Sequence, residues 1–220
     1  MISTITLDGI LPAPFAGING YSSEECCSDV WHKKIVLQRG RNYLIEAGSG
    51  TGKSSLCSFI YGNRRDFYGR IYFDDRATAT FSTEDWCEVR RRAISLLPQE
   101  MRLFPELTVM ENVLLKNRLT DFRTESEIRQ LLEETGLDNL ENQCAARLSI
   151  GQQQRVALVR ALCQPFDFLL LDEPVSHLDA ENNRTAAMMV QREAEAQGAA
   201  IVATSVGNPL LLSDYLMLQL

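Results

Sequence analysis

The glycine-rich segment at residues 48–55 constrains the fold of this 220-residue chain more than any other feature. It follows the apolar run 43–45, typical of a buried parallel strand, and it leads into 53–61, which has the pattern of an amphipathic helix. Glycines let backbone N–H groups converge on an anion, and a helix N-terminus adds partial positive charge. The segment therefore predicts a phosphate-binding loop in an α/β fold. Its residues are Gly48, Ser49, Gly50, Thr51, Gly52, Lys53, Ser54 and Ser55.

Two side chains of this loop have chemistry that suits a nucleotide. Lys53 is placed to reach the β- and γ-phosphates, and the Ser54 hydroxyl is placed to ligate Mg²⁺. The strict pattern GxxxxGK[ST] has a glycine where this chain has Ala47, and a methyl group there is tolerated if φ stays negative. The alternative is a flexible turn with an incidental lysine, which the strand–loop–helix setting disfavours.

A second segment supplies the carboxylates that a metal-bound nucleotide needs. The apolar run 168–171 predicts a buried strand, and Asp172 and Glu173 follow at its carboxyl end. Asp172 is expected near the metal, and Glu173 is expected to polarise a water for attack on the γ-phosphate. An apolar run ending in two acids is weak evidence alone, but it becomes strong beside the phosphate-binding loop.

The remaining chain alternates between strand and helix patterns, which predicts a mostly parallel sheet. A strand in a small antiparallel layer is expected at 70–74, and residues 108–136 look like an all-helical insertion between two halves of the sheet. Ser82, followed by Asp85, signals the start of a helix. The other expected strands are 4–7, two within 35–47, 94–97, 166–171, 199–204 and 215–218. The other expected helices are 82–92, 148–162 and 180–197.

Composition excludes several other classes of protein. Lys and Arg total 22 against 29 Asp and Glu, and the net charge of −7 argues against a protein that mainly grips nucleic acid. The six cysteines include no CxxC pair, so reduced thiols are expected. No run approaches the roughly 18 to 20 apolar residues of a membrane span, and no signal-like segment precedes Lys33. A cytoplasmic protein is expected unless a partner carries it to a membrane.

Three further motifs occur in a fixed order along the chain. They are Leu97-Pro98-Gln99, Leu148-Ser149-Ile150-Gly151-Gln152 and Ser176-His177-Leu178-Asp179. Together with 48–55 and 168–173, they make the chain resemble ATP-binding-cassette (ABC) ATPase subunits over nearly its whole length. The resemblance implies a P-loop NTPase fold in a single domain, 1–220. Its RecA-like core would span about 1–98 and 164–220, and a helical subdomain would span about 99–163.

The resemblance also implies roles for these motifs. Gln99 would reach Mg²⁺ or the attacking water, and Ser54 and Asp172 would complete the Mg²⁺ site. An aromatic residue before the phosphate loop would stack on adenine: Tyr21 is the first choice, with Phe15 and Trp31 as competitors. A second, signature half-site would close on ATP held by the other subunit of a head-to-tail homodimer. It comprises Ser149, Gly151, Gln152 and Asp179.

Two residues depart from the family pattern where chemistry is expected. Ile150 replaces the first of two signature glycines, which puts bulk where the backbone would approach a phosphate. Ser205 stands where the family usually has a histidine that contacts the γ-phosphate, and a serine cannot carry positive charge there. We therefore predict hydrolysis, with Glu173, Gln99 and Ser205 at the reacting centre, but at a slow rate.

The functional hypothesis is an ATP hydrolase that drives a separate membrane permease from the cytoplasmic face, with ATP and Mg²⁺ and without nucleic acid. The chain most resembles the ATPases of lipoprotein-release and macrolide-export systems. One rival is an ATP-binding dimerisation module with little turnover, and another is a soluble ABC ATPase that does not serve transport. Phe104, Leu107 and Val109 either meet the permease or form the core of the helical insertion.

Overall fold

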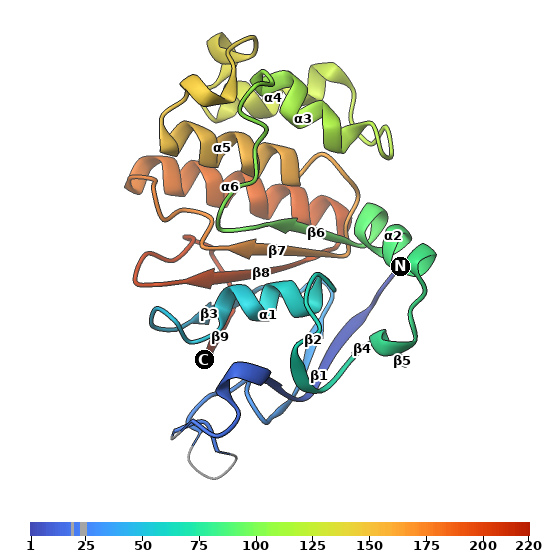
Figure 1. Cartoon of the computed structure of the whole chain (residues 1–220). Helices are drawn as coiled ribbons and strands as arrows, with labels where there is room; N and C mark the ends of the chain where they lie inside the picture. The colour runs from blue at the N-terminus through green and yellow to red at the C-terminus, as the bar shows by residue number, and fades with distance from the viewer. Residues whose placement is uncertain (19, 23–25) are drawn as a thin grey trace.

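The computed structural model describes residues 1–18, 20–22 and 26–220, and its centre is a five-stranded sheet in the order β6-β7-β8-β3-β9 (Figure 1). Every neighbouring pair in this sheet is parallel, as the alternating pattern predicted. The strands are β3 (Tyr43–Glu46), β6 (Ile94–Leu97), β7 (Phe168–Asp172), β8 (Ala200–Ser205) and β9 (Leu216–Gln219). Because their carboxyl ends share one edge, the phosphate loop after β3 lies near the acids that end β7.

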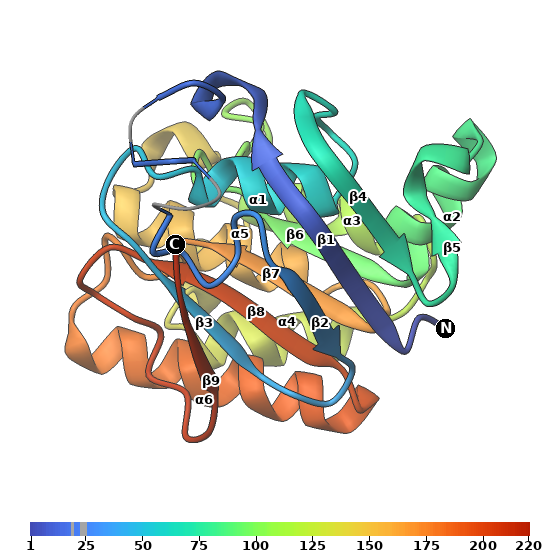
Figure 2. The ribbon, with the colours of Figure 1, turned by 90° about the horizontal axis from the view of Figure 1, so that it is seen from below.

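A second, antiparallel sheet has the order β2-β1-β4-β5 and lies on the opposite side of the central sheet from α6 (Figures 1 and 2). Its strands are β1 (Thr4–Pro12), β2 (Lys34–Gln38), β4 (Phe67–Phe73) and β5 (Arg76–Ala77). The predicted strand 4–7 ended too early. Gly9, at φ +61°, interrupts the alternation, but pairing with β4 resumes from Leu11 after a register shift.

The helices cover both faces of the central sheet, and β7 is buried on both sides. Leu169 and Leu171 pack into the core beneath α5 and α6, whereas Phe168 and Leu170 pack into the core that α1 and the antiparallel sheet share. The helices are α1 (Lys53–Ile60), α2 (Thr83–Arg92), α3 (Val109–Asn117), α4 (Glu125–Glu134), α5 (Ile150–Ala161) and α6 (Ala180–Gln197). Short 3₁₀ turns lie at Ala13–Phe15, Thr78–Thr80, Asp138–Leu140 and Ala145–Arg147.

Helices α3, α4 and α5 fill the chain between β6 and β7, so the predicted helical insertion is present. Its first part, 108–136, forms two helices, because Thr124 starts a new one with a capping box. The predicted helix 148–162 begins at Ile150, since Ser149 is its N-cap. The capping box of Ser82 and Asp85 at the start of α2 is present as predicted. None of the described helices combines the length and apolar character that crossing a bilayer requires.

Candidate active site

The loop between β3 and α1 is held tightly by its own backbone and by two aromatic rings. Gly52 precedes α1 at φ +98°, and a Cβ there would lie 2.9 Å from the Trp31 ring and 3.1 Å from the Phe15 ring, so only glycine fits. The Trp31 indole N–H donates to the carbonyl oxygen of Thr51 at 3.2 Å. The loop therefore presents the N-terminus of α1 in a fixed orientation.

Lys53 folds back over this loop. Lys53 is 5% exposed, and its Nζ donates to the carbonyl oxygens of Ala47 at 3.2 Å and Gly48 at 2.6 Å. The same nitrogen lies 3.8 Å from Oε1 of Glu173. The ammonium group is thus placed between the loop and the strand-end acid, where an anion entering the loop would meet it.

A cavity of about 340 Å³ opens in front of these groups. Lys53, Ser54, Gln99 and Glu173, which come from three separate segments, all line it. Ser54 Oγ donates to Gln99 Oε1 at 3.1 Å, so the loop after β6 reaches the phosphate loop. The remaining lining residues are Pro14, Phe15, Ser49, Gly50, Gly52, Ser55 and Arg64.

The end of β7 is organised by Thr204, a residue that the sequence analysis did not assign a role. Thr204 Oγ1 donates to Asp172 Oδ1 at 2.8 Å and accepts from the backbone N–H of Glu173 at 3.1 Å. Glu173 has φ +51°, a left-handed conformation that costs a non-glycine residue about 1 kcal/mol or more and recurs at functional sites. One hydroxyl therefore fixes Asp172 and the backbone of the strained Glu173 that follows it.

Replacing Thr204 by Val should destabilise the protein and misplace the two acids. The isosteric change leaves the Asp172 carboxylate and the Glu173 N–H without their buried partner, which costs about 1–3 kcal/mol. The melting temperature should fall by about 2–4 °C for each kcal/mol of folding stability that is lost. Ser205→Ala is the matched control, because it removes a hydroxyl from the same buried strand, and that hydroxyl has no hydrogen-bond partner among the residues that the structure describes. Equal melting temperatures for the two variants would contradict the role of Thr204.

Asp172 also lies close to α1. Burial, and after it the negative charge of Asp172, raises the pKa of the Cys57 thiol well above its usual value. Cys57 is therefore a protonated, unreactive thiol in the packing under the site.

The oxygen donors expected to hold Mg²⁺ suit that ion. They are a hydroxyl from Ser54, an amide oxygen from Gln99 and a carboxylate from Asp172, and Ser54 and Gln99 are in direct contact. The described residues contain no group of three or more His, Cys, Asp or Glu placed to hold a metal. Mg²⁺ typically takes one or two carboxylates with substrate phosphates and waters, so the sparse donor set fits it.

Ser205 ends β8 next to the phosphate loop, and its backbone oxygen accepts from the Ala47 N–H at 3.3 Å. Ser205 is 1% exposed, and its Oγ has no partner among the described residues. Ser205 is not one of the residues that line the cavity. The backbone of Ser205 is thus adjacent to the phosphate loop, but its hydroxyl is buried and does not line the cavity.

The signature residues lie at exposed helix N-termini and do not line the cavity. Ser149 and Gln152 form the capping box of α5, and Ile150 beside them is 53% exposed. Gly151 is closely packed, because a Cβ there would be 3.1 Å from the His177 carbonyl oxygen. Asp179 caps α6, and hydrogen bonds from the Asn182 backbone and side chain lower the pKa of its carboxyl group.

Gln154 links the signature helix to the acid, and the sequence analysis missed it. Its Nε2 donates to the Glu173 carbonyl oxygen at 3.0 Å and to Ser176 Oγ at 3.2 Å, and its Oε1 accepts from the His177 N–H at 3.0 Å. The signal available was helical spacing, since Gln154 lies three and four residues before the apolar Ala157 and Leu158 and so shares their side of the helix. Gln154 is 2% exposed, so α5 and the turn after Glu173 are expected to move as one body.

The three aromatic candidates occupy different positions. Phe15 lines the cavity, and the Tyr21 ring stacks on it with centroids 4.4 Å apart. Trp31 is fully buried under the loop, so it is not available to stack on a base. The choice of Tyr21 stays a prediction, with Phe15 between it and the cavity.

A strand, a glycine-rich loop and a helix, with an acid on a neighbouring parallel strand, define the class of P-loop nucleotide-binding proteins. The chain belongs to the ABC transporter family, whose model matches residues 33–176. The family and the fold predicted from the motifs are confirmed.

Similar proteins include several curated ATP-binding proteins. The lipoprotein-releasing system protein LolD of Nitrobacter hamburgensis is 35% identical over 149 residues, which cover 66% of this chain and 64% of LolD. The trimethylamine N-oxide transport protein TmoW of Pelagibacter ubique is 32% identical over 72% of this chain and 48% of TmoW. The phosphonates import protein PhnC of Alcaligenes faecalis is 36% identical over 83% of this chain and 69% of PhnC. The chain thus spans only about half to two thirds of the length of LolD and TmoW.

Among solved structures, the dimeric bacterial ABC transporter cassette MJ0796 matches with a TM-score of 0.75 and 25% identity, over 91% of this chain and 87% of MJ0796. A second structure of MJ0796, in a post-hydrolysis state bound to ADP and Pi, matches with a TM-score of 0.74 at the same identity.

Proposed function

We propose that this chain binds and hydrolyses ATP as the nucleotide-binding subunit of an ABC transporter and works with a separate membrane permease. The observation that carries the proposal is that Lys53, Ser54, Gln99 and Glu173 line one cavity, with Lys53 Nζ 3.8 Å from the Glu173 carboxylate. The relatives LolD and PhnC, which are named as ATP-binding proteins of release and import systems, support it.

The loop, the residues that follow it and the two acids after β7 each have a task in this reaction. The loop N–H groups and Lys53 bind the phosphates, for which Lys53 exchanges its bonds to Ala47 and Gly48 for phosphate oxygens. Glu173 accepts the proton of the water that attacks the γ-phosphate. Ser54, Gln99 and Asp172 would hold Mg²⁺, which neutralises charge on the phosphates when bound.

The signature residues make a second copy of the chain necessary. Ser149, Gly151 and Gln152 lie outside the cavity, at a helix N-terminus suited to an anion, and Asp179 lies outside it at the N-cap of α6. A head-to-tail homodimer would bring them to ATP held by the partner, and MJ0796 is described as dimeric. We place the dimer at the cytoplasmic face of the membrane, held there by the permease, and we expect no nucleic-acid partner from the net charge of −7.

Two observations favour a binding module with little turnover. Ser205 supplies no positive charge at its strand end, and the exposed Ile150 side chain stands at the start of the signature helix. Loss of one transition-state contact costs about 10²- to 10³-fold in rate. Slow hydrolysis therefore remains part of the proposal.

A steady-state assay of phosphate release on the purified chain tests hydrolysis and the role of Ser205 together. Wild type should release phosphate slowly, and Ser205→His should raise the rate by about tenfold or more, because an imidazole can donate to the γ-phosphate. Ser205→Asn controls for added bulk and should not raise the rate. If ATP makes wild type dimerise but no phosphate is released, the proposed hydrolysis is wrong. The chain would then be a binding module that dimerises with ATP.

A further inference from the structure

A second cavity, of about 360 Å³, lies between β4, the end of α1 and α2. We call it the aromatic cavity, because Phe59, Phe67, Tyr72 and Trp86 all line it. Sites for small molecules typically enclose about 300–1,000 Å³ and are lined mainly by apolar and aromatic side chains with a few polar groups. The aromatic cavity therefore has the size and the wall of a site for a small, ring-bearing molecule.

A glycine shapes the wall where Trp86 packs. Gly62 has φ +74°, and a Cβ there would lie 2.4 Å from the Trp86 ring, so the indole rests directly on the backbone. The indole N–H of Trp86 is buried and has no hydrogen-bond partner among the described residues. The wall thus combines a flat ring, held in place by close packing, with a donor that the described part of the chain does not use.

The charged residues of the aromatic cavity are all basic. Arg64, Arg65 and Arg70 line it, and no described Asp or Glu does, although the net charge of the whole chain is −7. Arg64 pairs with Asp66, so its charge is already compensated. Neither Arg65 nor Arg70 forms an ion pair in the described part of the chain, even though Asp8 lies opposite Arg70 in the β1–β4 register. Two guanidinium groups are therefore available to an anion.

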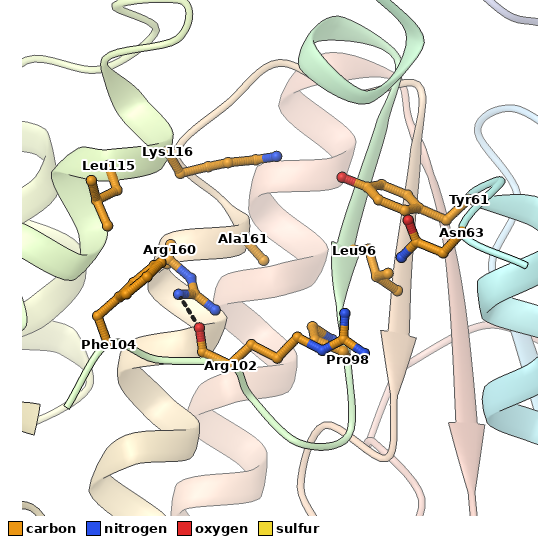
Figure 3. A pocket seen from close by; sticks show the side chains of 10 residues that line it. All are labelled: Tyr61, Asn63, Leu96, Pro98, Arg102, Phe104, Leu115, Lys116, Arg160 and Ala161. Carbon is orange, nitrogen blue, oxygen red and sulfur yellow. Dashed lines mark hydrogen bonds between the residues drawn. The ribbon is translucent and has the colours of Figure 1, made fainter. Parts of the chain in front are cut away.

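A different cavity, of about 270 Å³, lies between α3, α5 and the loop after β6 and is also lined by cations (Figure 3). There the Arg160 guanidinium donates to the carbonyl oxygens of Met101 and, at 2.8 Å, of Arg102. Arg102 in turn lies 3.5 Å from Glu100. The two arginines of that cavity thus serve the backbone and a neighbouring acid, which the two available arginines of the aromatic cavity do not.

We propose that the aromatic cavity binds a small aromatic anion, a planar ring that carries a carboxylate or phosphate group. The ring packs against Phe67 and Trp86, and the anionic oxygens accept hydrogen bonds from Arg65 and Arg70. A guanidinium suits this ligand twice over, because its planar fork matches both kinds of anion and it also packs on aromatic faces. A neutral ring would leave the arginines without a partner, and an inorganic anion would leave the aromatic wall in contact with water.

The two tryptophans of the chain allow a direct test by NMR of the isotope-labelled full chain. Their indole N–H groups give two signals, and the Trp86→Phe variant shows which one belongs to Trp86. The Trp31 N–H is bonded to Thr51 in the phosphate loop, so it reports on the ATP site instead. Titration with naphthalene-2-carboxylate should shift the Trp86 signal to saturation and leave the Trp31 signal in place.

Matched probes separate the ring from the charge. Naphthalene-2-carboxamide keeps the ring without the charge and should bind about tenfold more weakly, because hydrogen bonds to a charged group are stronger than those to a neutral one. Acetate keeps the charge without the ring and should leave both signals in place. The tighter of naphthalene-2-carboxylate and 2-naphthyl phosphate identifies which anionic group the site prefers.

Variants of the arginines decide whether the aromatic cavity is responsible. Arg65→Gln should reduce the preference for the carboxylate over the amide, and Arg65→Gln combined with Arg70→Gln should remove it. Arg91→Gln changes an exposed arginine of α2 that does not line the cavity, and it should bind both probes as wild type does. Equal affinity of wild type for the two probes, a shift of Trp31 in place of Trp86, or a preference unchanged in the double variant would overturn the proposal.

Discussion

Glu173→Gln is expected to reduce phosphate release by about 10²- to 10⁴-fold while ATP binding is retained. The amide keeps the size of the side chain, so the left-handed backbone at φ +51° and the bond from the Glu173 N–H to Thr204 persist. What is lost is the ability to accept a proton from the attacking water. The charge facing Lys53 at 3.8 Å is lost as well, which favours retention of bound ATP.

The measurement is single-turnover phosphate release, combined with light scattering to follow the dimer. Glu173→Gln should accumulate an ATP-bound dimer that wild type resolves. Glu46→Gln is the matched control, because this acid also ends a strand of the central sheet but does not line the cavity. A decrease of less than about tenfold would mean that another group accepts the proton, and the assignment of Glu173 would be wrong.

The parts of the site that the sequence predicted are those encoded in short contiguous segments. The phosphate loop and the acids after β7 are each adjacent to an apolar strand, so local pattern and topology together place them at one edge of the sheet. Capping works in the same way: Ser82 and Asp85 lie three residues apart and identified the start of α2. These features depend on a few neighbouring residues, which is why they were predictable.

The residues that were missed act through contacts between distant segments. Thr204 on β8 contacts Asp172 on the neighbouring strand β7, and Gln154 contacts Glu173, which lies 19 positions later in the chain. The bond from Arg160 to the Met101 carbonyl spans 59 positions. A polar residue in a buried strand or helix indicates that a partner exists but not which one. The length of β1 was missed for a related reason, since pairing with β4 continues past Gly9 where the local pattern stops.

Lys53→Met is expected to abolish ATP binding at concentrations where wild type is saturated, with an increase in Kd of about 10²-fold. Hydrogen bonds to charged groups contribute about 1.5–3 kcal/mol each, and Lys53 is predicted to reach two phosphates. Arg64 is the other cation that lines the cavity, but it is bonded to Asp66 and to Ser55 Oγ and does not replace the lysine.

Folding should survive this change, because methionine fills the volume of the buried stem. In the described part of the chain, the ammonium group donates to two loop carbonyl oxygens and faces Glu173. Isothermal titration with ATP gives the Kd, and Lys34→Met, at an exposed position in β2, is the control that should bind as wild type does. Unchanged affinity in Lys53→Met would place the phosphates elsewhere, with Arg64 as the next cation to replace. A loss confined to Lys53→Met ties the nucleotide to the loop after β3, and with it the roles assigned to Ser54 and Glu173.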